Sequence, residues 1–325
     1  MPTLNEIADR AGMSITVVSR VLSPKPELNS RVASRTRHHV LAIAKEMGYR
    51  PNRNAEFLKR GATPVIGVFL PRFDDSLVAR LTFGISDEAS RQNFPVSFHY
   101  DMSTESYHSF ISSAHSLRNC GIITFPYFET DINCEKMIEA YVKNRGRIVM
   151  ISRSQHMPDV TTVRIDDYYG GRLAGECLLR NGCTKVFAYA TIVSRADGCA
   201  DILRQHGIEC ESYIVGTTPL DTVYAKIKDS IADGLRTGVF AGTDRDAAMF
   251  YRFADDNGLK VGIDVLVVGY DNQNYSKLLN PALTTVDQPI EDIGCKAVKK
   301  LIALIYDQPV ESATVKPVLI KRESA

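Results

Sequence analysis

The spacing of apolar residues predicts three short helices in the first fifty positions of the chain. The first follows Thr3, which can cap it, and its apolar residues are Leu4, Ile7, Ala8 and Ala11. Gly12 breaks this helix, and Ser14 can cap a second one, whose apolar residues are Val17, Val18, Val21 and Leu22. A third helix follows a polar loop and ends at Gly48, with apolar residues Val40, Leu41, Ile43, Ala44 and Met47. A small all-α headpiece is expected, followed by a short segment between Pro51 and Gly61.

From Val65 onward, short β-rich apolar runs alternate with helical stretches. The strand-like runs are residues 65–70, 96–100, 122–125, 148–152, 162–166, 185–190, 212–216, 238–242, 265–271 and 315–320. Helical periodicity fills most of the intervals, for example residues 76–92, 169–181, 196–207, 221–234, 245–258 and 289–306. Continuous apolar strands between helices indicate parallel sheets covered on both faces. Two consecutive sets of this kind predict an α/β body made of two Rossmann-like lobes.

The two helices around Gly12 fit the helix-turn-helix pattern, in which the second helix enters the major groove of DNA. Arginine can form a bidentate bond to guanine, isoleucine can touch a thymine methyl, and serine or threonine can bind phosphates or base edges. The exposed face of the second helix would present such groups: Ser14, Ile15, Thr16, Ser19 and Arg20. The helix pattern alone equally allows a helical pair with a merely solvated polar face.

Charge divides the chain in the same place. Residues 1–60 hold 11 Lys and Arg against 5 Asp and Glu, whereas the remaining residues hold 28 basic and 33 acidic groups. A basic segment on a mildly acidic body suggests a polyanion-binding head and a body with another task. This signal is weak by itself, because a basic face is often only a solvated one.

The headpiece sequence resembles that of the lactose/galactose repressor (LacI/GalR) family of bacterial transcriptional regulators. The resemblance lies in TLNEIADRAGMSITVVSRVLS and TRHHVLAIAKEMGYRPNRNAEFL. The matching positions are Ala8, Ala11, Gly12, Ser14, Val18, Ser19, Arg20, Val21, Leu22, Thr36, Arg37, Gly48, Tyr49, Pro51, Asn52, Ala55 and Leu58. The family implies a helix-turn-helix headpiece on two lobes of the periplasmic-binding-protein-like type. We expect no cofactor.

The same resemblance implies a hinge helix at residues 52–60, which folds when a dimer sits on its operator. In it, Asn52 would be a DNA contact and Leu58 would be the apolar wedge inserted from the minor groove at the central base step. An ordinary packed leucine is the other interpretation of Leu58. Two departures from the family concern this region: the loop at residues 23–34 is about four residues longer than usual, and Glu56 stands where a carboxylate facing DNA would be repulsive.

The body resembles the family more weakly, and the resemblance places a ligand in the cleft between the lobes. It implies Arg195 and Asp271 as leading ligand contacts, because an arginine beside an aspartate can clamp vicinal hydroxyls or an acid group. Further contacts implied are Phe73, Asp75, Thr243 and Gln288. The alternatives are Arg195 as a surface charge or as a partner of Asp197, and Asp271 as a structural turn carboxylate. Departures at Asp75–Val78, Cys199 and Thr243 leave the effector's identity open.

Other classes of protein find less support in the sequence. No nucleophile elbow, P-loop or dinucleotide-binding glycine pattern follows any predicted strand, so an enzyme is not expected. A solute-binding protein or a Rossmann-type enzyme without a DNA-binding role is the competing hypothesis, and the headpiece argues against both. The 7 cysteines are scattered without metal-ligand spacing, which favours reduced thiols and no metal site. No apolar run is long enough to span a membrane and no secretory signal is expected, so we expect a cytoplasmic protein with no membrane partner.

The expected domains are a DNA-binding domain at 1–50, a hinge and linker at 51–62, and an effector-binding and dimerisation domain at 63–325. The expected partners are a palindromic DNA operator, a small effector that is a sugar or a sugar derivative, and a second copy of the chain. A homodimer is expected because the two-fold symmetry of a palindrome requires two headpieces. The sequence shows no heptad tail that would call for a tetramer. It leaves open whether the ligand releases or promotes DNA binding.

Overall fold

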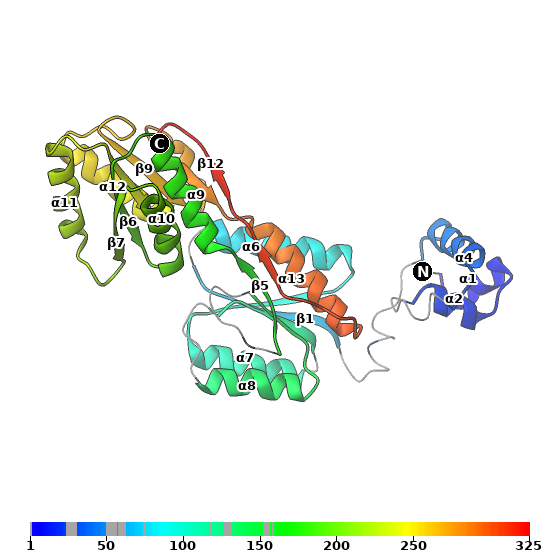
Figure 1. Cartoon of the computed structure of the whole chain (residues 1–325). Coiled ribbons are helices and arrows are strands. Elements are labelled where there is room, and N and C mark those ends of the chain that lie inside the picture. Colours follow the sequence, from blue (N-terminus) through cyan, green and yellow to red (C-terminus); the bar gives the residue numbers. More distant parts are fainter. Residues whose placement is uncertain are drawn as a thin grey trace.

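The computed structural model describes residues 2–23, 31–49, 57, 63–73, 76–117, 119–126, 132–151, 157 and 159–325. Figure 1 shows a small helical headpiece and a body of two α/β lobes. The expected fold class, a helix-turn-helix headpiece with two Rossmann-like lobes, is confirmed.

The headpiece helices are α1 (Leu4–Ala11), α2 (Ile15–Val21) and α4 (Ser34–Glu46). Thr3 begins α1 with a reciprocal cap, in which its hydroxyl accepts the N–H of Glu6 and the Glu6 carboxylate accepts the N–H of Thr3. Gly12 ends α1 in the left-handed region at φ +62°, which glycine adopts without the steric cost of a Cβ. The helices share one core made of Ile7, Ala8, Ala11, Val18, Val21, Val40, Ile43 and Ala44. Its members come only from the headpiece, so the headpiece has a core of its own.

The first lobe is a six-stranded sheet, among the described residues, with helices on both faces. Its strand order is β11-β5-β4-β3-β1-β2, with β1 (Thr63–Leu70), β2 (Val96–Tyr100), β3 (Asn119–Thr124), β4 (Ile148–Ile151), β5 (Thr161–Ile165) and β11 (Ala313–Val315). All of these pairings are parallel. One face packs against α6 (Ser76–Arg91) and α13 (Ile290–Ile305), and the other against α7 (Thr104–Ser116) and α8 (Ile132–Lys143).

The second lobe repeats this plan. Its described strands run in the order β12-β10-β9-β8-β6-β7, with β6 (Lys185–Ala190), β7 (Glu209–Ile214), β8 (Thr237–Ala241), β9 (Val265–Tyr270), β10 (Thr284–Asp287) and β12 (Val318–Ile320). Only β12 is antiparallel to its neighbour in this described sheet. The helices are α9 (Asp167–Arg180) and α10 (Val193–Gln205) on one face, and α11 (Leu220–Ala232) and α12 (Asp244–Asp256) on the other. A 3₁₀ turn, η1 (Ser276–Leu278), follows β9.

In the described part of the body, the chain passes between the lobes three times: from β5 to α9, from β10 to α13 and from β11 to β12. The single strand-like run expected at 315–320 is therefore wrong in one respect. Lys316 and Pro317 divide it into two strands, and these strands belong to different sheets. Since proline cannot donate a ladder hydrogen bond, a crossover is a suitable place for it.

Glycines allow α9 and α10 to pack closely. A Cβ on Gly171 would overlap the backbone carbonyl of Arg195, and a Cβ on Gly198 would overlap that of Tyr168. Each helix thus presents a glycine to the backbone of the other. Because the backbone of Arg195 lies in this contact, the close approach of the two helices also fixes the position of its Cα atom.

We expect Gly198→Ala to lower the free energy of unfolding by about 1–3 kcal/mol, because the added methyl must push α9 and α10 apart. Chemical denaturation of the full chain measures this. Asp197→Ala, at an exposed position of the same helix, is the control and should change stability by no more than about 0.5 kcal/mol. Equal stability of the Gly198→Ala variant and the native chain would contradict the proposed packing constraint.

Candidate DNA-binding and effector-binding sites

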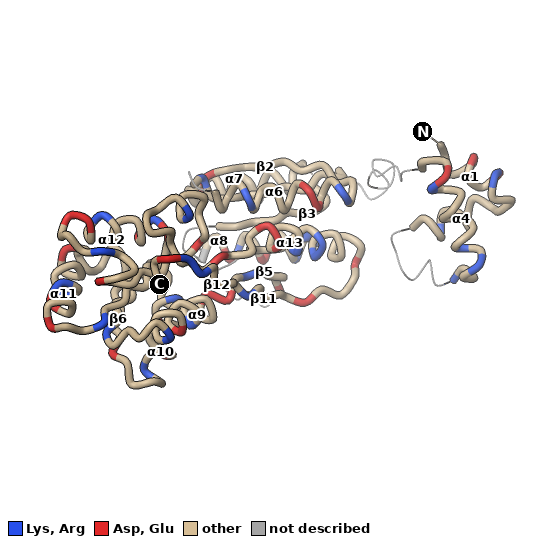
Figure 2. Tube along the Cα trace, turned by 90° about the horizontal axis from the view of Figure 1, so that it is seen from above, with Lys and Arg blue, Asp and Glu red and all other residues tan. Residues whose placement is uncertain are grey.

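Helix α2 has one buried and one polar face. The Ser14 hydroxyl caps it by accepting the N–H of Val17 at 3.4 Å. Val18 and Val21 are buried, while Val17, also expected inside, is half-buried. The side chains predicted to contact DNA are all exposed: Ser14, Ile15, Thr16, Ser19 and Arg20. Figure 2 shows lysines and arginines, together with a few acidic residues, distributed over the headpiece helices.

Three predicted site residues, Asn52, Leu58 and Asp75, lie outside the described residues, as does Glu56. Within the expected hinge the structure describes Phe57, which is helical and buried. Its ring centroid lies 5.8 Å from that of Phe94, in the core of the first lobe. Position 57 is therefore anchored in the body.

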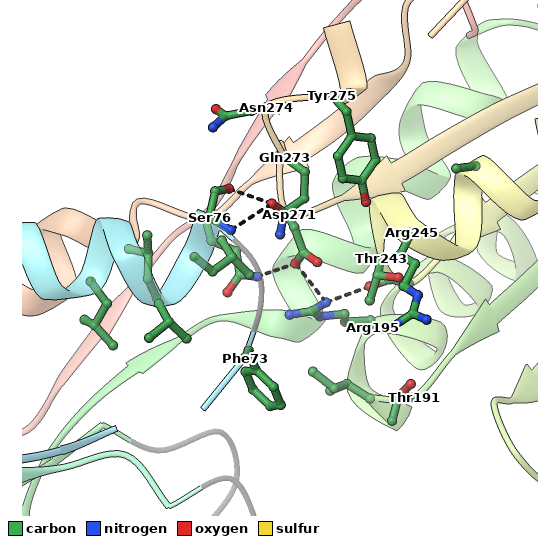
Figure 3. A pocket seen from close by; sticks show the side chains of 18 of the residues that line it. Phe73, Ser76, Thr191, Arg195, Thr243, Arg245, Asp271, Gln273, Asn274 and Tyr275 are labelled. Atoms are coloured by element: carbon green, nitrogen blue, oxygen red, sulfur yellow. Dashed lines mark hydrogen bonds and ion pairs between the residues drawn. The ribbon is translucent and has the colours of Figure 1, made fainter. Parts of the chain in front are cut away.

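A cavity of about 940 Å³ lies between the lobes. Its floor in the second lobe is formed where three parallel strands end, because Thr191 follows β6, Gly242 follows β8 and Asp271 follows β9. Phe73 and Phe125 line it from the corresponding edge of the first lobe. Figure 3 shows polar side chains from several elements, among them Ser76, Arg195, Asp271 and Gln273, pointing toward one another at this cavity. A crevice outside the carboxyl ends of parallel strands is the usual ligand position in α/β proteins.

Arg195 is the most constrained residue of this cavity. It is 2% exposed; its Nε donates to Oδ1 of Asp167 at 2.7 Å and its Nη1 to the carbonyl of Gly242 at 2.7 Å. The guanidinium carbon lies 3.6 Å from the centroid of the Tyr270 ring, whose hydroxyl also donates to Asp167 at 3.2 Å. Burial by itself lowers the pKa of Arg195, but the carboxylates of Asp167 and Asp271 more than offset this and raise it. The buried Nη2 has no hydrogen-bond partner among the described residues. A ligand oxygen would satisfy it.

Asp271 stands beside this arginine and is held in an uncommon backbone conformation, at φ +107°. Its Oδ1 accepts from Nε2 of Gln288 at 2.5 Å and from Nη1 of Arg195 at 3.5 Å. The following residue, Asn272, also has a positive φ of +49°. Unfavourable backbone conformations of non-glycine residues cluster at ligand sites, where the surroundings enforce them.

The fully buried Asp244 helps to hold the loop after β9 in this conformation. Its Oδ2 accepts the N–H of Gln273 at 2.7 Å and its Oδ1 accepts the hydroxyl of Thr285 at 2.5 Å. Burial, with a smaller contribution from the charge of Asp271, raises the pKa of Asp244 to about 7, against the hydrogen bonds from Thr285 and Gln273. Asp244 therefore ties the loop that carries Gln273 to α12 and β10.

Two side-chain contacts join the lobes beside the cavity. The N–H and hydroxyl of Ser76, at the start of α6, both donate to Oε1 of Gln273 in the second lobe, at 3.3 and 2.5 Å. Arg80, one turn further along α6, pairs with Asp287 at the end of β10 at 3.2 Å. A change in lobe orientation would have to break or rearrange these bonds.

The predicted effector residues that are described all line this cavity: Phe73, Arg195, Thr243, Asp271 and Gln288. The two alternatives for Arg195, a surface charge or a partner of Asp197, are wrong because it is buried and paired with Asp167. The Thr243 hydroxyl caps α12 by accepting the N–H of Asp246 at 3.0 Å. Cys199, expected to bear on ligand choice, is instead fully buried in the core of the second lobe and is not among the lining residues.

Sequence reasoning missed several residues of this site: Ser76, Asp167, Arg245, Gln273 and Tyr275. In the structure Asp166 caps α9 and Asp167 is the buried partner of Arg195. Its place directly after a predicted strand was the available signal, since strand ends meet at the cleft.

Within the described residues, no group of His, Cys, Asp and Glu side chains could hold a metal ion. None of the described helices has the length and apolar character needed to cross a membrane.

Two family models match the chain in keeping with this architecture. Residues 3–52 match the bacterial regulatory proteins of the lacI family, and residues 176–325 match the periplasmic binding protein-like domain. The chain belongs to the LacI/GalR family. It is a DNA-binding transcriptional regulator with an effector-binding body, and family membership places it among regulators rather than enzymes.

Curated LacI/GalR relatives are similar over nearly the whole chain. The NTD biosynthesis operon regulator NtdR of Bacillus subtilis (strain 168) is 29% identical, over 94% of this chain and 93% of the relative. The ribose operon repressor of the same organism is 27% identical, over 98% and 96%. Among solved structures, the lac repressor dimer bound to operator and the anti-inducer ONPF covers 99% of this chain and 98% of its own, at 24% identity and a TM-score of 0.68. The CelR–cellobiose complex has the same identity and TM-score with full coverage of both chains.

The raised pKa of Asp244 predicts how stability depends on pH. In the unfolded chain this carboxyl loses its proton near its ordinary pKa of 3.8, whereas in the folded chain it keeps the proton up to about pH 7. Unfolding between these values releases a proton, so the contribution of Asp244 to stability decreases as the pH rises through this window. Asp244→Asn should remove this part of the pH dependence, measured by denaturation at a series of pH values from about 5 to 8.

Asp255→Asn, an exposed position on the same helix, serves as the control and should leave the slope unchanged. An unchanged slope in Asp244→Asn would show that Asp244 does not titrate in this range.

Proposed function

We propose that the chain binds a palindromic operator as a homodimer through α2, and that a carbohydrate or carbohydrate derivative bound between the lobes controls its affinity for DNA. The observation that carries this proposal is the interlobe cavity in which buried Arg195, beside Asp271, keeps one donor that no described residue satisfies. A paired arginine and aspartate suit the hydroxyl groups of a sugar, which donate and accept hydrogen bonds. The same chain carries the helix-turn-helix unit that such an effector would control.

In this proposal residues 1–50 bind DNA, residues 51–62 form the hinge and linker, and residues 63–325 bind the effector and dimerise. Arg20 reads a base, Ile15 contacts a thymine methyl, and Ser14, Thr16 and Ser19 bind phosphates or base edges. Asn52 and Leu58 contact the operator from the hinge, Leu58 as a minor-groove wedge. The target is chromosomal DNA, so the protein works in the cytoplasm.

Relatives support the effector class. They include a ribose operon repressor and PurR repressors, and structures of similar fold contain cellobiose, ribose or D-xylulofuranose. For this chain, Phe73 and Phe125 offer aromatic surfaces to a sugar ring, while Arg195, Asp271 and Gln288 offer polar groups. Asp75 and Thr243 complete the proposed site. Effector binding would change the lobe orientation across the Ser76–Gln273 and Arg80–Asp287 bonds, with a coupling of about 1–3 kcal/mol.

The DNA-binding part is tested with DNA from upstream of the chain's own gene, in gel-shift titrations of the full protein at several salt concentrations. Arg20→Ala should weaken binding by about 1–3 kcal/mol and relax the choice of base at one position of each half-site, because a bidentate contact is lost. Arg252→Ala, an exposed arginine of the second lobe, is the control. Unchanged affinity and specificity in Arg20→Ala would reject the base-reading role.

An apolar surface suited to dimerisation lies on the first lobe. Phe83 of α6, Tyr100 at the end of β2 and the adjacent Met102 are 61%, 42% and 39% exposed, and we name them the α6–β2 patch. Thr82 and Tyr100 share a hydrogen bond of 3.2 Å, so α6 and the end of β2 are in contact. β2 is also an edge strand of its sheet. Exposed apolar patches next to sheet edges mark contact surfaces.

We expect Phe83→Asp to shift the protein from dimer toward monomer, because a buried unpaired carboxylate is costly. Analytical ultracentrifugation detects the shift, and operator affinity should decrease with it. Ile263→Asp, an equally exposed apolar position of the second lobe, should leave the dimer intact. A Phe83→Asp variant that remains a full dimer would exclude the α6–β2 patch as an essential part of the interface.

A further inference from the structure

The cavity between the lobes is lined by two arginines with different surroundings. Arg195 is neutralised, since Asp167 and Asp271 both face its guanidinium. Arg245, in the first turn of α12, lines the same cavity and is exposed. Its guanidinium makes no hydrogen bond or ion pair with the residues that the structure describes. Figure 3 shows both arginines in the second-lobe wall, on either side of Thr243.

No carboxylate of the described residues forms an ion pair with Arg245. Asp271 is the one carboxylate among the described lining residues, and its Oδ1 accepts from Gln288 and Arg195. Asp246, next to Arg245 in the chain, attracts it through its charge, but its carboxylate accepts the hydroxyl of Thr243 at 2.8 Å. The wall of the second lobe therefore presents a guanidinium that no described side chain binds directly.

Two helix N-termini add to this charge. Helix α10 begins directly after Thr191 and Ile192, and α12 directly after Thr243, and all three of these residues line the cavity. No side chain of the described residues caps α10, whereas Thr243 caps α12. The N-terminal ends of helices carry partial positive charge and bind anions. The buried Nη2 of Arg195 is a further donor without a partner in the described part of the site.

We propose that the effector carries an anionic group, a phosphate or a carboxylate, which Arg245 binds while Nη2 of Arg195 takes a neighbouring oxygen of the same molecule. This inference rests on the proposed function, because it names the class of effector for that cavity. A neutral sugar would leave the Arg245 guanidinium without a direct partner when the cavity fills, and removing such a charge from water is costly. An anionic group offsets that cost, because it forms a charge-assisted hydrogen bond with the guanidinium.

The experiment compares matched neutral and charged probes by isothermal titration calorimetry on the full chain. The probes are D-ribose and D-ribose 5-phosphate, and D-glucose with D-glucose 6-phosphate and D-glucuronate. We expect a charged member of one set to bind about tenfold or more tightly than its neutral counterpart. Tighter binding of a phosphate ester or of the uronate identifies which anion the site accepts.

Variants test whether Arg245 causes the preference for the charged probe. Arg245→Gln should abolish the preference for the charged probe, whereas Arg245→Lys should retain most of the preference. Arg252→Gln, an exposed arginine on the same helix, is the matched control and should behave as the native chain. Equal binding of neutral and charged probes to the native chain, or a preference that survives in Arg245→Gln, overturns the proposal.

Failure of this inference can be distinguished from failure of the proposed function. If a neutral sugar binds and changes operator affinity in gel shifts without any advantage for its charged counterpart, the anionic effector is rejected and the carbohydrate effector stands. If none of the five probes binds at millimolar concentration, both are rejected.

Discussion

The body of this protein depends on one buried cation. The guanidinium of Arg195 is enclosed by a carboxylate from the start of α9, a carbonyl at the end of β8, an aromatic ring from β9 and an aspartate in the loop that follows it. Removing such a charge from water is costly unless each neighbour is in place. The second lobe must therefore be assembled correctly around Arg195 for the cavity to exist. The glycine contacts between α9 and α10 bring the backbone of Arg195 within reach of Asp167.

The same arrangement connects binding to conformation. Arg195 and Asp271 face the cavity, and Gln288, which donates to Asp271, lies in the crossover between β10 and α13. Gln273, two residues after Asp271, bonds to Ser76 of the other lobe. A ligand that binds Arg195 and Asp271 would therefore contact residues close to both the crossover at Gln288 and the interlobe contact between Gln273 and Ser76. Short chains of buried hydrogen bonds with two arrangements are a physical route for coupling between sites.

Much of the fold followed from local sequence patterns. Thr3, Gly12 and Ser14 mark helix ends through capping chemistry, and the structure shows each cap. The fully buried strands β6, β8 and β9 were visible as apolar runs, because strands covered on both faces need no polar positions. The split of residues 315–320 between two sheets was not visible, since β11 and β12 differ in tertiary partners and not in local composition.

The site was less accessible to prediction from sequence. Arg195 and Asp271 came from a resemblance, and their geometry depends on elements far apart in the chain. Helix α10 begins at Val193, earlier than the apolar pattern indicated, so Arg195 belongs to the helix. The roles of Asp167, Gln273 and Arg245 in the site depend on tertiary contacts, which no local sequence pattern predicts. Cys199 illustrates the converse, because a departure from the family pattern proved to lie in the core.

The three crossovers also bear on the order in which the protein is made. The headpiece has its own core from residues before 50, whereas the first lobe needs α13 and β11, and the second needs β12, all near residues 290–320. Because chains fold from the N-terminus as they leave the ribosome, the DNA-reading helices can be complete while both lobes still lack strands. During that interval the nascent chain has a DNA-binding unit but no cavity. Control by an effector is thus acquired only after α13, β11 and β12 have been synthesised.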